Sequence, residues 1–251
     1  MAFIHIHDFG GGGVKPMLIL LHGLLGTSRN LAVVARAFVG TRRVIGLDMR
    51  NHGESSWENS HRYQDLAEDV ANTLQSFDTP YDLLGHSMGG KAAMAGVLAG
   101  ILKPRKLVVG DIAPVSYAHT QAHVIAAMQA VDLNAFTRKG PLAHHLSEVL
   151  GDPAIGPFLA QAADFSGPPR WTHNLEVLAA EMDDIVGFPS LDQTSDQEVL
   201  FISGGASNYV QEDLVKSVFP KAAFHWIEGA GHWVHAEAPD QFNTAASGFL
   251  G

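Results

Sequence analysis

Runs of consecutive apolar residues recur along the chain and predict the strands of a buried sheet. These runs are apolar at both odd and even positions, as expected for parallel strands that are covered on two faces. They occupy residues 17–23 (MLILLHG), 43–48 (RVIGLD), 81–86 (YDLLGH), 106–111 (KLVVGD) and 199–205 (VLFISGG). The alternating segment 2–9 (AFIHIHDF) predicts a first strand, and the segment 222–242 predicts a last strand, a small-residue loop and a closing helix.

Helical patterns separate most of these strands. In residues 63–77, apolar side chains recur at helical spacing at Leu66, Val70 and Leu74, which predicts an amphipathic helix. Strands that alternate with such helices predict right-handed βαβ units in an α/β fold with a mostly parallel, doubly wound sheet. Because ligands of these sheets bind beyond the carboxyl ends of the strands, we expect functional residues in the loops that follow strands.

The alternation stops after residue 114. Residues 115–190 contain helical stretches at 119–133, 141–150 and 170–188, separated by Pro/Gly turns and without a clear strand. We interpret residues 115–190 as an inserted helical cap on an α/β core formed by residues 1–114 and 191–251. The large apolar residues of the cap are expected mainly to pack its helices, and lining an acyl pocket is the second interpretation. They include Phe158, Phe165, Trp171 and Met182.

Composition excludes several classes of function. The 251 residues carry a net charge of -10 and no Lys/Arg-rich run, which argues against nucleic acid as a partner. Cysteine is absent, so disulfides, thiolate catalysis and Cys-ligated metals are excluded. The first residues lack a basic-then-apolar leader, and no apolar run is long enough to span a bilayer. We therefore expect a cytoplasmic protein with a small-molecule substrate; no pattern indicates its oligomeric state.

The segment Gly85-His86-Ser87-Met88-Gly89 joins a predicted buried strand to a small-residue helical pattern. Gly-x-Ser-x-Gly in this context is typical of a nucleophile elbow, a sharp turn that holds the serine hydroxyl out at the top of the sheet. The glycines allow close backbone approach, and the helix N-terminus directs unpaired N–H groups toward developing negative charge. The alternative is a serine that only caps a helix, which this context disfavours. We predict that Ser87 is a nucleophile.

A serine nucleophile needs a base and an orienting acid, in the chain order serine, acid, histidine. His232 follows the last predicted strand in a small-residue loop and is the expected base. His235 and Glu237 lie close by and together with His232 suggest a metal site. We expect no metal, because the paired histidines of a zinc-peptidase helix are absent. His235 is then structural.

Two positions compete for the acid. It would commonly follow the strand 199–205, but the loop there has no carboxylate before Glu212 and Asp213, which are expected inside the next helix. Asp111 ends the strand that follows the nucleophile's strand, where its side chain can reach the same edge of the sheet. We predict Asp111 as the acid. The alternative is that Asp111 only braces the loop 112–114.

Backbone amides complete the expected site. The N–H groups of Met88 and Leu24 are predicted to form the oxyanion hole. His22 is expected to hydrogen-bond within its own loop rather than take part in the chemistry. The loop at 48–52 contains Asp48, Arg50, Asn51 and His52, which either brace the site or belong to a solvated loop; none is assigned to catalysis.

Several motifs together resemble the α/β-hydrolase superfamily, and within it the small bacterial esterases of the YbfF type. They are HGLLG (22–26), DMRNHGES (48–55), GHSMGGKAAM (85–94), DIAPV (111–115) and GAGHWVHAEAPD (229–240). The resemblance covers nearly all of the chain and is weakest in the cap. It implies a serine hydrolase of acyl esters, with acyl-CoA thioesters as a further substrate class and a basic entrance near the cap if thioesters are preferred.

The resemblance also implies roles for individual residues. Ser87 would be the nucleophile, Asp111 the acid and His232 the base, and Ser207 matches a serine at the usual acid position that would assist His232. No metal or organic cofactor is implied. A carbon–carbon bond hydrolase, a lyase or a perhydrolase could use the same residues with another pocket, and a non-catalytic ligand receptor could use the same fold.

Overall fold

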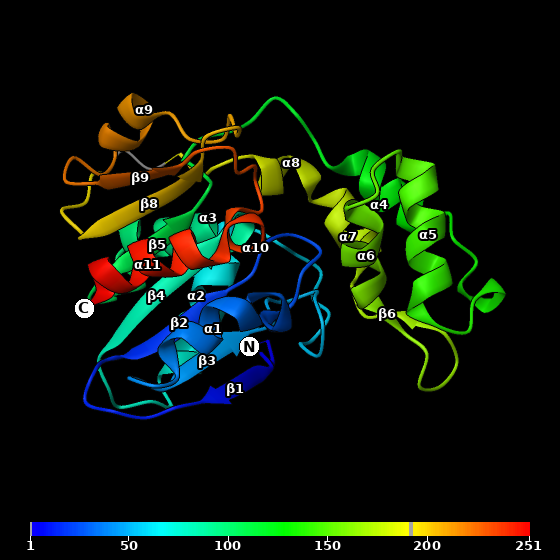
Figure 1. Cartoon of the computed structure of the whole chain (residues 1–251), viewed down its shortest axis with the longest axis horizontal. Helices are drawn as coiled ribbons and strands as arrows, with labels where there is room; N and C mark the ends of the chain where they lie inside the picture. Colours follow the sequence, from blue (N-terminus) through cyan, green and yellow to red (C-terminus); the bar gives the residue numbers. More distant parts are fainter. Residues whose placement is uncertain (1, 191–192) are drawn as a thin grey trace.

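A seven-stranded sheet forms the centre of the computed structural model, which describes residues 2–190 and 193–251 (Figure 1). The strand order is β1-β3-β2-β4-β5-β8-β9; β1 runs antiparallel to β3, and the other neighbouring pairs are parallel. The strands are β1 (Ile6–Gly10), β2 (Met17–Leu21), β3 (Val44–Leu47), β4 (Tyr81–His86), β5 (Leu107–Gly110), β8 (Val199–Gly204) and β9 (Ala223–Ile227). The predicted α/β fold with a mostly parallel sheet is confirmed.

Helices cover both faces of the sheet. Successive residues of β2 point to opposite sides, so Leu18 packs in one apolar cluster and Ile19 in the other. The helices α1 (Ala32–Phe38), α10 (Val234–Glu237) and α11 (Pro239–Leu250) contribute to the cluster of Leu18. The helices α2 (Tyr63–Leu74), α3 (Met88–Leu98) and α9 (Glu212–Lys216) contribute to the cluster of Ile19. This two-sided burial explains why the strands are continuous apolar runs.

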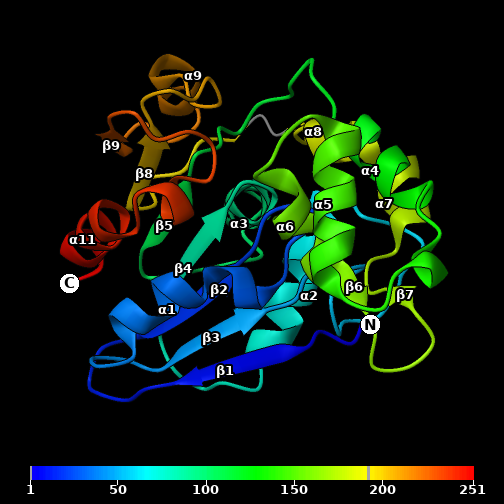
Figure 2. The same ribbon diagram turned by 45° about the vertical axis from the view of Figure 1, so that its right-hand side comes forward.

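The chain between β5 and β8 forms a helical segment with an apolar cluster of its own, beside the sheet at the right of Figures 1 and 2. Its helices are α4 (Ala122–Gln129), α5 (Lys139–Leu150), α6 (Ile155–Leu159), α7 (Leu175–Ala180) and α8 (Met182–Val186). The segment also contains the short 3₁₀ helices η2 (Leu133–Ala135) and η3 (Ala160–Ala162), and a third, η1 (Ser28–Leu31), precedes α1 in the core. The buried side chains of Ile125, Leu142 and Leu178 hold the segment together.

Two expectations for this segment were wrong. It contains a small antiparallel pair, β6 (Ala163–Asp164) with β7 (Arg170–Trp171), whose two-residue strands are too short to produce an alternating pattern. The helix expected at 170–188 begins only at Leu175 and is divided into α7 and α8 at Glu181. Residues 1 and 191, at which the two parts of the predicted core begin, lie outside the described residues. Within the described ranges, no helix is long and apolar enough to cross a membrane.

Candidate active site

Ser87 lies in a tight turn between β4 and α3. Its backbone has a φ of 51°, a left-handed conformation that a residue other than glycine rarely adopts. A Cβ atom on Gly85 would lie 2.5 Å from the carbonyl oxygen of Gly89, and one on Gly89 would lie 2.5 Å from that of Leu21. The close approach therefore requires glycine at both positions, which explains the Gly-x-Ser-x-Gly spacing.

Hydrogen bonds connect Ser87, His232 and Asp111. The Ser87 hydroxyl oxygen lies 3.0 Å from Nε2 of His232, and Nδ1 of His232 lies 2.8 Å from Oδ2 of Asp111. Because a carboxylate accepts at Nδ1, that nitrogen carries the proton and Nε2 is left to accept from the serine hydroxyl. The three residues come from loops after β4, β5 and β9, at one edge of the sheet.

Asp111 is fully buried and is held by further donors. The Gly204 N–H donates to Oδ1 at 3.0 Å, and the Ser207 hydroxyl donates to Oδ2 at 2.5 Å. Ser207 thus contacts the carboxylate rather than the imidazole. Glu212, one of the competing acids, is partly exposed and accepts instead from the side chains of Lys216 and Trp226.

The amides expected at the oxyanion hole border the same space. Leu24 and Met88 line a cavity together with Ser87. Among the described residues, the N–H groups of Leu24 and Met88 donate to no protein acceptor. The neighbouring Leu25 N–H, by contrast, donates to Nε2 of His52. Two amide donors therefore remain available beside the Ser87 hydroxyl.

Glu237, the acidic residue near His232, contacts the backbone of the loop that carries His232. Glu237 accepts from the N–H groups of Gly231 at 2.6 Å and Trp233 at 3.2 Å, so it braces the loop that carries His232. His235 is buried against the His86 ring, with 4.4 Å between ring centroids, and burial lowers its pKa to about 4. In the part of the chain that the structure describes, no group of three His, Asp or Glu side chains is arranged to hold a metal ion.

Comparison with known proteins agrees with this geometry. Residues 18–245 match the family model described as "Alpha/beta hydrolase family". The chain belongs to the alpha/beta hydrolase family. It is 38% identical to Esterase YbfF of Escherichia coli K12, over 93% of this chain and 92% of that protein. It is 36% identical to the sn-1-specific diacylglycerol lipase ABHD11 of Mus musculus, over 96% of this chain and 82% of that one.

A solved structure described as a marine microorganism esterase superposes with a TM-score of 0.91 at 29% identity, covering 99% of this chain and all of that one. The resemblance to α/β-hydrolases, and within them to esterases of the YbfF type, is thereby confirmed.

The cavity at the site of this alpha/beta hydrolase has a volume of about 380 Å³. The core contributes Leu24 and Leu25, and the helical segment contributes Val124, Ile155 and Phe158. Phe158 therefore lines the cavity as well as packing its own segment, whereas the other large residues considered, Phe165, Trp171 and Met182, pack against the apolar cluster of the segment.

Two contacts in this alpha/beta hydrolase had no signal in the sequence. The Tyr209 ring stacks on the His232 ring with 4.1 Å between centroids and 25° between planes. The buried Lys91 directs Nζ to the carbonyl oxygens of Val186, at 2.8 Å, and Gly187, at 2.6 Å, and burial lowers its pKa to about 7. Both contacts join residues far apart in the chain, so spacing along one element could not indicate them.

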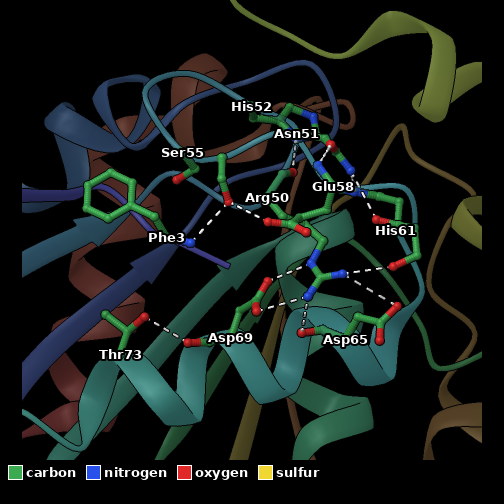
Figure 3. Close-up of polar contacts among 12 residues, drawn as sticks. Phe3, Arg50, Asn51, His52, Ser55, Glu58, His61, Asp65, Asp69 and Thr73 are labelled. Carbon is green, nitrogen blue, oxygen red and sulfur yellow. Dashed lines mark hydrogen bonds and ion pairs between the residues drawn. The ribbon is translucent and has the colours of Figure 1, made fainter. Parts of the chain in front are cut away.

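The loop after β3 is buried and braced, which agrees with the first of the two alternatives, a bracing role, and not with a solvated loop. Arg50 forms two hydrogen bonds with Asp69 of α2, at 2.6 and 2.9 Å (Figure 3). It forms another with the Ser60 hydroxyl. Asp48 accepts from the N–H groups of Ser28 and Glu54. This alpha/beta hydrolase therefore holds the loop rigidly against α2, close to the site.

Proposed function

We propose that this protein hydrolyses carboxylic acyl esters through a covalent acyl-enzyme at Ser87, with His232 as the general base and Asp111 as its orienting acid. The observation that carries the proposal is the continuous hydrogen-bond chain from the Ser87 hydroxyl through His232 to Asp111. The family of the chain and the esterase and lipase names of its relatives support an ester as the substrate.

In the first step, His232 removes the Ser87 proton at Nε2 while Oγ attacks the ester carbonyl carbon. The negative oxygen of the tetrahedral intermediate accepts from the N–H groups of Leu24 and Met88. His232 then donates its proton to the departing alcohol oxygen, which leaves the acyl group on Ser87. In the second step, His232 deprotonates a water that attacks the acyl-enzyme carbonyl carbon. His232 then returns this proton to the Ser87 oxygen as its bond to the acyl group breaks, which releases the carboxylic acid and restores the free serine.

Asp111 accepts the Nδ1–H of His232 throughout, so it fixes the imidazole tautomer and stabilises the imidazolium that forms in each step. We propose that Ser207 assists His232 indirectly, because its hydroxyl donates to the carboxylate oxygen that His232 contacts. That bond keeps the carboxylate turned toward the imidazole.

We propose that residues 115–190 act as a cap that forms one wall of the substrate pocket. The support is that Val124, Ile155 and Phe158 line the same cavity as Ser87, together with Leu24 and Leu25 of the core. An apolar lining of this kind suits the acyl chain of an ester, which loses contact with water when it binds. The cap thus selects the acyl chain, while the core carries the chemistry.

Acyl-CoA thioesters are a second candidate class, favoured by one observation. A second hollow, of about 1300 Å³, shares Asn30 with the catalytic cavity and also borders the exposed Trp57. Its basic lining residues are Arg29, Arg138, Lys139 and Arg170. Carboxylates offset part of this charge, since Asp164 lies 3.0 Å from Arg170 and Glu54 lies 3.9 Å from Arg29. Simple esters therefore remain the primary proposal.

Replacement of Ser87 tests the nucleophile. Ser87→Ala should lower the turnover of p-nitrophenyl esters by about four to six orders of magnitude, because the attacking oxygen is lost. Ser217→Ala, on the exposed α9 side of the molecule, is the matched control and should be unchanged. A fluorophosphonate should label the wild-type protein at Ser87. Near-normal turnover in Ser87→Ala would contradict the proposal.

A substrate panel separates the remaining alternatives. Esters and acyl-CoA thioesters of graded and matched acyl length should be compared with β-diketones, which a carbon–carbon bond hydrolase would cleave. We expect steady multiple turnover of esters. Faster cleavage of diketones would favour the carbon–carbon bond hydrolase, and a single labelling of Ser87 without turnover would favour the non-catalytic receptor.

A further inference from the structure

Three buried histidines join the loop that carries Leu24 to the loop after β3. We call residues 22–26 the oxyanion loop and residues 49–53 the β3 loop. His22 makes the first connection: its Nδ1 lies 2.8 Å from the Gly23 carbonyl oxygen, and its Nε2 accepts from the Met49 N–H at 2.9 Å. The imidazole therefore bridges one carbonyl of the oxyanion loop and one amide of the β3 loop.

The other two histidines hold Leu25 from both sides. The Leu25 N–H donates to Nε2 of His52 at 3.1 Å, and Nδ1 of His52 lies 3.0 Å from the Arg50 carbonyl oxygen. The Leu25 carbonyl oxygen lies 3.0 Å from Nε2 of His173, whose Nδ1 accepts from the Gly53 N–H at 3.2 Å. His173 belongs to the cap, so the cap contacts the oxyanion loop directly.

Each of these imidazoles can make its two bonds only in the neutral form. In each ring one nitrogen accepts from a backbone N–H, so the other must carry the proton and donate to a backbone carbonyl. A second proton would remove the acceptor. Burial lowers the pKa of His22, His52 and His173, that of His173 to about 4, which keeps all three neutral at physiological pH.

The bridged backbone is strained. In the described ranges, four residues other than glycine have a positive φ: Leu25, Asn51, Ser87 and Asp111. Two of these are proposed catalytic residues, and the other two lie in the two bridged loops. Such conformations persist only where the surroundings impose them. For Leu25, with a φ of 60°, the imposing contacts are those with His52 and His173.

The β3 loop is itself anchored, on one side to α2 and on the other to the cap. Arg50 binds Asp69 of α2 (Figure 3). The carbonyl oxygen of Asn51 accepts from the N–H of Asn174, the cap residue after His173, at 2.9 Å. His173 therefore acts from a fixed position relative to the sheet. A shift of His52 or His173 would therefore move Leu25. It would also reorient the Leu24 amide, because the two peptide groups are adjacent.

We propose that His52 and His173 are positioning residues that hold the Leu24 amide in line with the oxyanion, so that the cap takes part in aligning the catalytic site as well as in binding the acyl chain. The proposal rests on the ester hydrolysis proposed above. An amide donor that is turned away from the oxyanion stabilises the transition state less while leaving the bound ester almost unaffected.

The matched variants at position 173 are His173→Phe, which keeps the ring and loses both bonds, and His173→Gln, whose amide NH₂ can still donate to the Leu25 carbonyl. His123→Phe, on the exposed face of α4, is the control. We expect His173→Phe to lower kcat by about 10- to 100-fold and to change KM by no more than about threefold. This loss of kcat is smaller than that expected from removing an oxyanion donor completely, because the Leu24 amide is misaligned but still present. His173→Gln should recover most of the loss, and His123→Phe should match the wild type.

A trifluoromethyl ketone distinguishes alignment from packing, because its adduct with Ser87 places a negative oxygen in the oxyanion hole. Its affinity should fall by the same factor as kcat/KM in His173→Phe, while the affinity for a product carboxylic acid stays the same. If His173→Phe does not fold, His52→Leu against His52→Gln gives the same comparison, since only glutamine can accept from the Leu25 N–H.

An increase in KM with unchanged kcat, or an equal loss of affinity for the ketone and the product acid, would overturn the proposal and leave ester hydrolysis intact. Failure of the proposed function would look different: Ser87→Ala would remain active, or the wild type would not turn over esters. The two failures are therefore distinguishable in one set of assays.

Discussion

At the scale of single residues, the proposed acid, Asp111, follows β5 rather than β8. The two strands are parallel neighbours, so the loops after both end at the same edge of the sheet and both reach His232. Asp111 occupies the β5 position, and Ser207, after β8, donates to it. Chain order restricted the acid to a position between Ser87 and His232, and the absence of a carboxylate at 204–208 favoured Asp111.

Substitution of the two candidate acids tests this choice. Asp111→Asn should lower kcat by about 10³- to 10⁴-fold, because the amide no longer fixes the imidazole tautomer or stabilises the imidazolium. Asp213→Asn, in the first turn of α9, should remain close to the wild type. Steady-state hydrolysis of a p-nitrophenyl ester measures both. A crippled Asp213→Asn beside an active Asp111→Asn would move the acid to the loop after β8.

At the scale of elements, the sequence predicts what depends on local burial and misses what depends on contacts between elements. The run that became β2 is apolar at every position because helices cover both faces of the sheet, and the elbow is marked by glycines that the turn requires. The stacking of Tyr209 on His232 and the bridges of His52 and His173 depend on how distant loops meet, which no spacing along the chain encodes.

Lys91 illustrates a contact between elements that can be tested. It lies one turn after Ser87 in α3, and its ammonium group donates to the carbonyl oxygens of Val186 and Gly187 at the end of α8. The last carbonyls of a helix lack intrahelical partners and favour a nearby cation. Lys91 thus connects α3, which begins directly after Ser87, to the end of α8, where the chain returns from the helical segment toward β8.

Lys91→Met should leave these two carbonyls unpaired. We expect the free energy of unfolding to fall by about 1–3 kcal/mol, and KM to rise as the cavity wall formed by α8 loosens. Lys103→Met, at an exposed position, is the control for loss of a lysine charge. Urea unfolding and steady-state kinetics measure the two effects. Unchanged stability and KM would show that the contact does not hold the cap to α3.

At the scale of the whole molecule, buried neutral histidines surround the site. Of the 14 histidines in the chain, those at positions 22, 52, 61, 86, 173 and 235 are buried. Burial lowers the pKa of His61 to about 3 and that of His173 and His235 to about 4. These side chains serve as neutral donors, acceptors and packing groups, so the architecture of the site requires that they remain unprotonated.

This burial predicts instability in acid. In the unfolded chain each histidine has a pKa near 6.5, so between about pH 6.5 and 4 the unfolded state binds protons that the folded state does not. The stabilisation is complete above pH 6.5 and is lost as the pH falls toward 4. His61, His173 and His235 each contribute about one proton, so these three histidines alone should lower the free energy of unfolding by about 4 kcal/mol per pH unit near pH 5. Urea unfolding from pH 8 to 4 measures this slope. His173→Gln should reduce the slope by the contribution of about one proton, because glutamine does not titrate in this range. A free energy of unfolding that stays constant down to pH 5 would mean that these histidines are protonated in the folded state, which is incompatible with imidazoles that bridge backbone donors and acceptors.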